Sequence, residues 1–259
     1  MILNVNVHLN YAINYPTDVI LRIAVPNLPD QRVLEENISY GENVEFSNVP
    51  AEGGIGERTL MNIDRNLNCR YAARIEVDRP IFDIANLSAT PPYQLPADAI
   101  RYLMPSRFCQ SDELQSYVAA EFGDSSGGQR ITQLRDWIFE RYQYVSGSSN
   151  EHTTAIDTFV QRKGVCRDFA HVLIALSRAS AIPARFVSVY APFVTPQDFH
   201  AVAEVYLDGA WHLVDATGMA ASNQMARIGV GLDAAEVPFM ASFGPAQMQH
   251  QSVEVWIEG

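Results

Sequence analysis

The sequence predicts an α+β protein, in which an N-terminal antiparallel β-sandwich-like domain is followed by helices and then by a second antiparallel sheet. Apolar residues alternate with polar ones through the first third of the chain, whereas beyond about residue 110 they recur at helical spacing. The stretch between these regions, Leu87–Pro105, contains four prolines and is typical of a surface linker. We therefore expect a β-rich domain at residues 1–86, a linker at 87–105 and a second domain at 106–259.

The composition is that of a soluble globular protein, since 47% of the 259 residues are hydrophobic and 19% are charged. The formal net charge of −12 is spread along the chain, and it disfavours nucleic acid or an anionic membrane as a partner. The first residues lack the basic and apolar regions of a signal peptide, and no apolar run is long enough to cross a bilayer. We expect a cytoplasmic location.

The β-rich domain is predicted from a period of two in its first strand. Polar residues alternate there with an apolar set that would bury one face of the strand: Leu3, Val5, Val7, Leu9 and Tyr11. Further extended segments, separated by turns that contain glycine or proline, are expected at Asp18–Val25, Arg32–Ser39, Glu57–Ile63 and Asn68–Val77. No constellation suited to catalysis is visible in this half, and we interpret it as a packing or recognition module.

Helices are expected after the linker. Asp112–Phe122 follows Ser111, a favoured N-cap residue, and Thr154–Gln161 carries Asp157 in its first turn. A longer helix between them is indicated by apolar residues at helical spacing: Ile131, Leu134, Trp137 and Ile138.

The strongest helix is predicted at Arg167–Ser180, which has a continuous apolar stripe and ends before Pro183. Antiparallel strands are expected after it at Arg185–Ala191, Phe199–Leu207 and Ala210–Ala216, with Val253–Ile257 closing the same sheet.

Cys166 stands at the start of the Arg167–Ser180 helix. Unpaired backbone N–H groups at such a position favour a thiolate over a thiol, and they could also hold an oxyanion. On its own, a cysteine near a helix start is more often an inert buried residue. The interpretation therefore depends on whether a base lies beside it.

The hairpin that follows supplies a base and a carboxylate. Asp208-Gly209 is the signal of a two-residue type I′ turn, and with that loop Val202 pairs with Asp215. His200 then lies on the same face as Asp215, as its diagonal neighbour, whereas a slip of one residue would place the two on opposite faces. The sequence thus predicts a nucleophile, a base and an orienting carboxylate: Cys166, His200 and Asp215.

The other histidines and cysteines show no comparable arrangement. His171 is about 140° around the helix from Cys166, which predicts a place in the core, and His212 has the opposite strand parity from Asp215. Cys69 and Cys109 have no base nearby and are interpreted as structural thiols. No CxxC or HExxH spacing is present, so we expect neither a metal nor another cofactor, and no disulfide framework.

The two blocks that carry the triad residues, GVCRDFA (164–170) and HAVAEVYLDGAWHLVDAT (200–217), resemble the core of the transglutaminase-like superfamily. YLMPSRF (102–108) is similar to a junction in the family's bacterial branch of candidate cysteine proteases, which also has a β-rich N-terminal region. The resemblance implies a papain-like core, with the nucleophile at a helix N-terminus against an antiparallel sheet. Many relatives have tryptophan at the position of Val202 and proline at that of Ala216, so these differences could reshape the cleft.

The resemblance and the triad together predict thiol-dependent acyl transfer on an amide bond of a peptide or protein, through a thioester. Water as the acceptor would make a cysteine peptidase or amidase, and an amine would make a transglutaminase; hydrolysis is simpler because it needs no second binding site. A non-catalytic binding module on the same fold is the alternative from another class. Asp168 is expected to stabilise the helix start, while Arg167 either binds a substrate carboxylate or pairs with an acidic neighbour.

Overall fold

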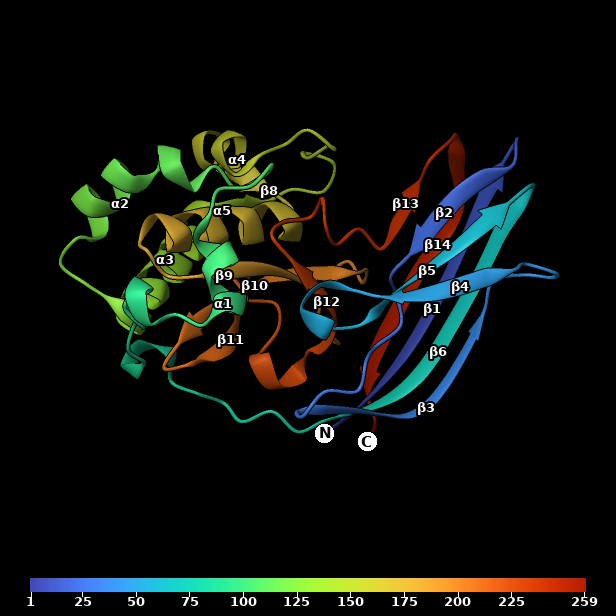
Figure 1. Cartoon of the computed structure of the whole chain (residues 1–259), viewed down its shortest axis with the longest axis horizontal. Helices are drawn as coiled ribbons and strands as arrows, with labels where there is room; N and C mark the ends of the chain where they lie inside the picture. Colours follow the sequence, from blue (N-terminus) through green and yellow to red (C-terminus); the bar gives the residue numbers. More distant parts are fainter.

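The computed structural model describes all 259 residues, arranged as two units side by side (Figure 1). A sandwich of two four-stranded antiparallel sheets forms the right half of Figure 1, and helices with a third four-stranded sheet form the left half. This arrangement confirms the predicted α+β class. None of the helices combines the length and the apolar character needed to cross a bilayer.

The sandwich contains every strand predicted for the N-terminal part and three more. Its sheets have the strand orders β14-β1-β6-β3 and β13-β2-β5-β4. The strands are β1 (Ile2–Ile13), β2 (Thr17–Leu21), β3 (Gln31–Ser39), β4 (Phe46–Pro50), β5 (Glu57–Ile63), β6 (Asn66–Val77), β13 (Met240–Ser242) and β14 (Ala246–Ile257). β4 was not predicted, because all its residues are exposed and it therefore lacks the apolar alternation of a half-buried strand.

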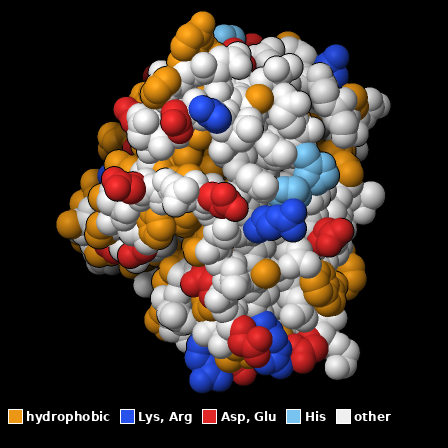
Figure 2. Space-filling view, turned by 90° about the vertical axis from the view of Figure 1, so that its right-hand side faces the viewer, with side chains coloured by type: hydrophobic (Ala, Val, Ile, Leu, Met, Phe, Trp, Pro, Cys, Tyr) orange, Lys and Arg blue, Asp and Glu red, His pale blue; other side chains and the backbone are white.

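The alternation of apolar and polar residues in β1 fits its position between β14 and β6 in the sheet. Its odd-numbered residues from Leu3 to Ile13 are buried in the sandwich core, while Asn4, Asn6, His8 and Asn10 point outward. Figure 2 looks at the sandwich end of the molecule, where acidic and basic side chains lie scattered among uncharged polar ones. This surface carries no single block of like charge.

The C-terminal strands return to the sandwich, which corrects the predicted domain division. β14 pairs antiparallel with β1, with Ile257 opposite Leu3, and β13 pairs with β2. Residues 106–259 therefore do not form one domain, and Val253–Ile257 closes the sandwich instead of the second sheet. Alternation in that segment predicts a half-buried strand, but it does not say which sheet buries it.

The second unit is built on a sheet of order β11-β10-β9-β12. Its strands are β9 (Ala184–Tyr190), β10 (His200–Leu207), β11 (Ala210–Val214) and β12 (Ala226–Gly231), and a short parallel pair is formed by β7 (Gln143–Tyr144) and β8 (Lys163–Gly164). Its helices are α1 (Ala97–Ile100), α2 (Gln115–Phe122), α3 (Gly127–Arg141), α4 (Ala155–Gln161) and α5 (Cys166–Ala179). The apolar stripe of α5 is fully buried and packs on β9 and β10.

The N-terminal caps of two helices, α4 and α2, can be compared with the sequence predictions. Thr154 caps α4 by accepting the N–H of Asp157 at 3.2 Å, while the Asp157 carboxylate accepts the N–H of Thr154 at 2.9 Å. The predicted cap at Ser111 is wrong, because Ser111–Glu113 forms a separate 3-10 turn and α2 begins later, at Gln115.

The predicted linker is packed against the second unit. Leu95 and Ala99 are buried beside Tyr206, and the Tyr102 ring meets Trp211 edge-on at 5.3 Å. Leu87–Pro105 therefore covers the hairpin formed by β10 and β11, and it is not a free spacer.

The sandwich core and a buried ionic network both extend into the second unit. Tyr190 of β9 lies in the sandwich core and donates a 2.8 Å hydrogen bond to the carbonyl of Ile23. Fully buried Glu204 accepts from Arg185 at 2.7 Å and from Arg227 at 2.8 Å. Arg227 also pairs with Asp30 of the sandwich, which extends the network across the interface. The sandwich is thus continuous with the second unit in both packing and charge.

We expect Val255→Ala in β14 to lower the free energy of unfolding by about 2 kcal/mol, because this side chain is buried in the sandwich core. Urea denaturation measures the change. Glu254→Ala, on the exposed face of the same strand, is the control and should stay within about 0.5 kcal/mol of wild type. Equal effects of the two substitutions would contradict the place of β14 in the core.

Candidate active site

Cys166 is the first residue of α5 and is partly exposed. The buried Asp168 fixes the chain just before it, since its carboxylate accepts the N–H of Val165 at 2.9 Å. Gly164 permits this contact, because a Cβ there would lie 2.6 Å from the Cβ of Asp168. The Asp168 side chain therefore holds the nucleophile's backbone in place.

Arg167 faces the loop that covers the start of α5. It donates to the Asp168 carboxylate at 3.2 Å, and to the carbonyl oxygens of Asn150 at 2.6 Å and Thr153 at 3.2 Å. Of the two roles predicted for it, the structure therefore has Arg167 paired with an acidic neighbour.

His200 begins β10, and Asp215 follows the last residue of β11. Positive φ angles at Asp208 (47°) and Gly209 (77°) form the predicted turn, and Ala203 pairs with Val214, which is the predicted register. Nε2 of His200 consequently lies 2.9 Å from Oδ2 of Asp215. Both side chains are buried.

Further donors hold the Asp215 carboxylate. The backbone N–H and the hydroxyl of Thr217 donate to Oδ1 at 2.8 and 2.7 Å, and the N–H of Ala220 donates to Oδ2 at 3.0 Å. Burial would raise the pKa of Asp215, but the hydrogen bonds from His200 and Thr217 hold that pKa below its ordinary value. Asp215 is therefore a fixed carboxylate that orients the imidazole.

The protonation of His200 follows from these contacts. Burial would lower its pKa, but the hydrogen bond to Asp215 and the neighbouring Cys166 thiol raise it to about 10, which favours the imidazolium at neutral pH. Nδ1 is buried without a hydrogen-bond partner in the chain. Since Nε2 is bound to Asp215, Nδ1 is the ring atom available to the Cys166 thiol.

Tyr144 is a neighbour of Cys166 that the sequence did not indicate. β7 pairs in parallel with β8, which sets Tyr144 opposite Gly164 just before the nucleophile. Burial, followed by the neighbouring Cys166 thiol, raises the pKa of Tyr144 to about 12. The hydroxyl is therefore a neutral donor beside Cys166. No sequence signal pointed to it, because β7 and β8 are only two residues long each.

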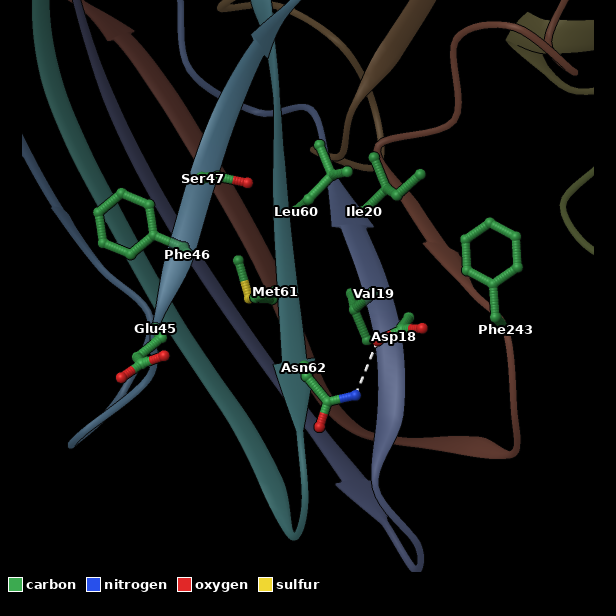
Figure 3. A pocket seen from close by; sticks show the side chains of 10 residues that line it. All are labelled: Asp18, Val19, Ile20, Glu45, Phe46, Ser47, Leu60, Met61, Asn62 and Phe243. Atoms are coloured by element: carbon green, nitrogen blue, oxygen red, sulfur yellow. Dashed lines mark hydrogen bonds between the residues drawn. The ribbon is translucent and has the colours of Figure 1, made fainter.

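Cys166 and His200 line one cavity of about 300 Å³. A larger hollow of about 680 Å³ lies on the sandwich, where Figure 3 shows Ile20 and Leu60 side by side between Phe46 and Phe243. That hollow has no cysteine or histidine in its lining. Of these two hollows, only the smaller one brings a thiol and an imidazole together.

The remaining candidates lie away from this cavity. His171 is buried between the rings of Phe108 and Phe186. Nε2 of His212 lies 3.2 Å from the carbonyl oxygen of Leu207, and no hydrogen bond joins His212 to Cys166, His200 or Asp215. Burial raises the pKa values of Cys69 and Cys109 to about 12, which fits structural thiols.

Val202 and Ala216, the positions at which the chain departs from many relatives, are also buried, and neither lines the cavity. The differences at these positions therefore affect the packing around the site more directly than the cavity lining.

Comparison with known proteins agrees with this geometry. A family model described as the transglutaminase-like superfamily matches residues 116–216, a range that contains all three triad residues. A crystal structure of a protein from Cytophaga hutchinsonii, named a "putative cysteine protease", has a TM-score of 0.93 and 33% sequence identity with this chain. That alignment covers 99% of this chain and 90% of the other. This chain belongs to the transglutaminase-like superfamily.

Curated relatives of this superfamily member match over shorter stretches. An uncharacterised protein of Mycobacterium leprae is 28% identical over 109 residues, which is 39% of each chain. One from Mycobacterium tuberculosis is 34% identical over 83 residues, which is 31% of this chain and 26% of the relative. This chain therefore spans less than half the length of these curated relatives. At the level of the superfamily, the fold and its similarity to the Cytophaga protein support thiol-dependent acyl transfer.

We expect His200 and His171 to have opposite protonation states at pH 7. His200, with its pKa raised to about 10, should be an imidazolium, whereas His171, whose pKa burial lowers to about 3, should be neutral. Nε2 of His171 accepts the N–H of Ala234 at 3.1 Å, so its proton should reside on Nδ1. Nitrogen NMR of the imidazole rings measures both states.

In Asp215→Asn, His200 should titrate at lower pH, because the carboxylate that stabilises the imidazolium is gone. His171 should be unchanged and serves as the internal control. A neutral His200 ring in wild type at pH 7 would contradict the proposed electrostatics.

Proposed function

We propose that this superfamily member hydrolyses an amide bond of a peptide or protein through a Cys166–His200–Asp215 triad. The observation that carries the proposal is the buried 2.9 Å hydrogen bond between His200 and Asp215, which leaves Nδ1 of the imidazole for the thiol. The name of the Cytophaga hutchinsonii protein, which matches along nearly the whole chain, supports hydrolysis.

In this mechanism the Cys166 sulfur attacks the amide carbonyl and forms a tetrahedral intermediate. The imidazolium of His200 gives its Nδ1 proton to the leaving amine, and the thioester forms as the C–N bond breaks. The neutral imidazole then takes a proton from water as it attacks the thioester, the C–S bond breaks, and the acid leaves while the thiolate and the imidazolium are restored. Asp215 keeps the ring oriented through Nε2 and stabilises its charged form.

Two donors suit the oxyanion of the intermediate. One is the backbone N–H of Cys166 at the start of α5, and the other is the hydroxyl of Tyr144 beside it. A raised pKa keeps the tyrosine protonated at neutral pH, so that it can donate. Tyr144 thus supplies the second donor for which the sequence alone had no candidate.

Transfer of the acyl group to an amine is the alternative reaction on the same thioester, and it needs an acceptor in place of water. A binding module is the alternative from outside catalysis. The partly exposed sulfur beside a charged imidazolium supports an enzyme over a binding module, because a binding surface has no need of an activated thiol.

We expect iodoacetamide to alkylate Cys166 rapidly below pH 7 in wild type, because an imidazolium favours the thiolate. His200→Ala should slow the reaction at pH 6 on the order of a hundredfold, because the variant lacks the imidazolium beside the sulfur. The reaction rate against pH, followed by mass spectrometry, measures this. His152→Ala, an exposed histidine, is the control, and buried Cys69 and Cys109 should not react. Identical profiles in wild type and His200→Ala would favour the binding module.

We expect Tyr144→Phe to lower kcat about 10²–10³-fold on a peptide amide that wild type cleaves, with little change in KM, since an oxyanion donor acts in the transition state. Tyr142→Phe is the matched control, because that hydroxyl accepts from Arg162 at 3.0 Å and not from the site. A kcat that survives Tyr144→Phe would show that Tyr144 only packs beside the thiol.

A further inference from the structure

The cavity beside Cys166 is built from both units of the molecule. His200 is the first residue of β10 and Phe199 precedes it, whereas Val237–Met240 and Gln251 belong to the chain that returns to the sandwich. The rings of Phe199 and Phe239 stack at 4.5 Å with 9° between their planes. One wall of the cavity is therefore aromatic and spans the interface.

Besides Cys166 and His200, the cavity has two charged side chains in its lining, and they differ in their pairing. Arg167 is bound to Asp168 and to two backbone carbonyls. Asp198 is exposed and forms no ion pair; its Oδ1 accepts the N–H of Phe199 and the side-chain amide of Gln251, both at 2.8 Å. A carboxylate without a basic partner thus stands two residues before the catalytic histidine.

Asp198 is oriented from the sandwich. Tyr11 of β1 donates to Oε1 of Gln251 at 3.3 Å, and Nε2 of Gln251 donates to Asp198. The charge of Asp198 acts on two tyrosines. Burial is the main cause of the raised pKa of Tyr11, and Asp198 adds to it. Burial and the Cys166 thiol are the main causes of the raised pKa of Tyr144, and Asp198 again adds to it. Its field is therefore felt beside the reacting sulfur.

We propose that Asp198 forms a subsite for a cationic group of the substrate, an ammonium or a guanidinium, next to the aromatic wall of Phe199 and Phe239. The inference rests on the proposed function, because it concerns a substrate that reaches Cys166. A carboxylate that already forms an ion pair would have to give it up to bind such a ligand. Asp198 forms no ion pair, so a cationic ligand adds a charge-assisted hydrogen bond. The net charge of −12 further attracts cations to the molecule.

The source of the cation is limited by the size of the site. At about 300 Å³ the cavity is at the small end of ligand pockets, so the cation and the scissile bond belong to the same residue or to adjacent ones. A lysine or arginine side chain and a free peptide α-amino group both meet this condition with the same chemistry.

Charged thiol reagents test the subsite without any knowledge of the substrate. Two methanethiosulfonates, one with a trimethylammonium and one with a sulfonate group, transfer their thioalkyl groups to Cys166 by the same reaction. We expect Asp198→Asn to lower the ratio of the cationic to the anionic rate about tenfold, because the carboxylate attracts one reagent and repels the other. Asp208→Asn, in the turn at the opposite end of β10, is the matched control and should keep the wild-type ratio.

An unchanged ratio in Asp198→Asn would overturn the subsite. A fall in the rate with neutral iodoacetamide equal to the fall with the cationic reagent would also overturn it, since Asp198 would then position the nucleophile and not select a charge. Neither measurement requires turnover. Failure of wild type to hydrolyse any amide would therefore count against the proposed function alone.

Peptide amides distinguish the two sources of the cation. Substrates with lysine or norleucine at the scissile residue, each with a free or an acetylated N-terminus, are compared by kcat/KM. If Asp198→Asn removes the advantage of lysine over norleucine, the subsite holds a side chain; if it removes the advantage of the free terminus, the subsite holds an α-amine. Loss of neither advantage would overturn its role in substrate selection.

Discussion

The hydrogen bond between His200 and Asp215 is 2.9 Å long with both side chains buried, and several elements combine to make it possible. The Asp208-Gly209 turn fixes which residues of β10 and β11 face each other, and Thr217 holds the carboxylate at its other oxygen. Two buried ionisable groups would each be costly alone, and as a pair each stabilises the charged form of the other. The same bond points the second ring nitrogen toward the thiol, so one contact determines both the charge and the direction of the base.

Cys166, the proposed nucleophile, is positioned by an independent set of contacts. Asp168 ties the backbone before α5, and a side chain at position 164 would collide with it, so a glycine is required there. α5 in turn packs on β9 and β10. This packing places the start of the helix near His200, the first residue of β10. Helix and hairpin thus meet through the buried core of the second unit, and the reacting groups depend on that packing more than on any direct bond between them.

The sequence predicted the parts of the site that local signals define. The two-residue turn predicted the hairpin register and the apolar stripe predicted α5, so the placement of His200 beside Asp215 could be predicted from local signals. Tyr144 could not be found in this way, because β7 is only two residues long. Its place beside Cys166 depends on pairing with β8, which lies later in the chain. Nor could the return of β14, since alternation shows that a strand has one buried face but not which of two sheets it joins.

The returning chain also lines the cavity beside Cys166. The match to the superfamily ends at residue 216, whereas the cavity is completed by Phe239 and Gln251, which come from the later chain that rejoins the sandwich. Gln251 reaches Asp198 from β14 and is itself held by Tyr11 of β1. The shared core therefore contains the reacting groups, while part of what a substrate would meet is supplied by strands outside it. The match to the superfamily therefore covers Cys166, His200 and Asp215 but not every residue that lines the cavity, and membership specifies the type of reaction more closely than the molecule on which it acts.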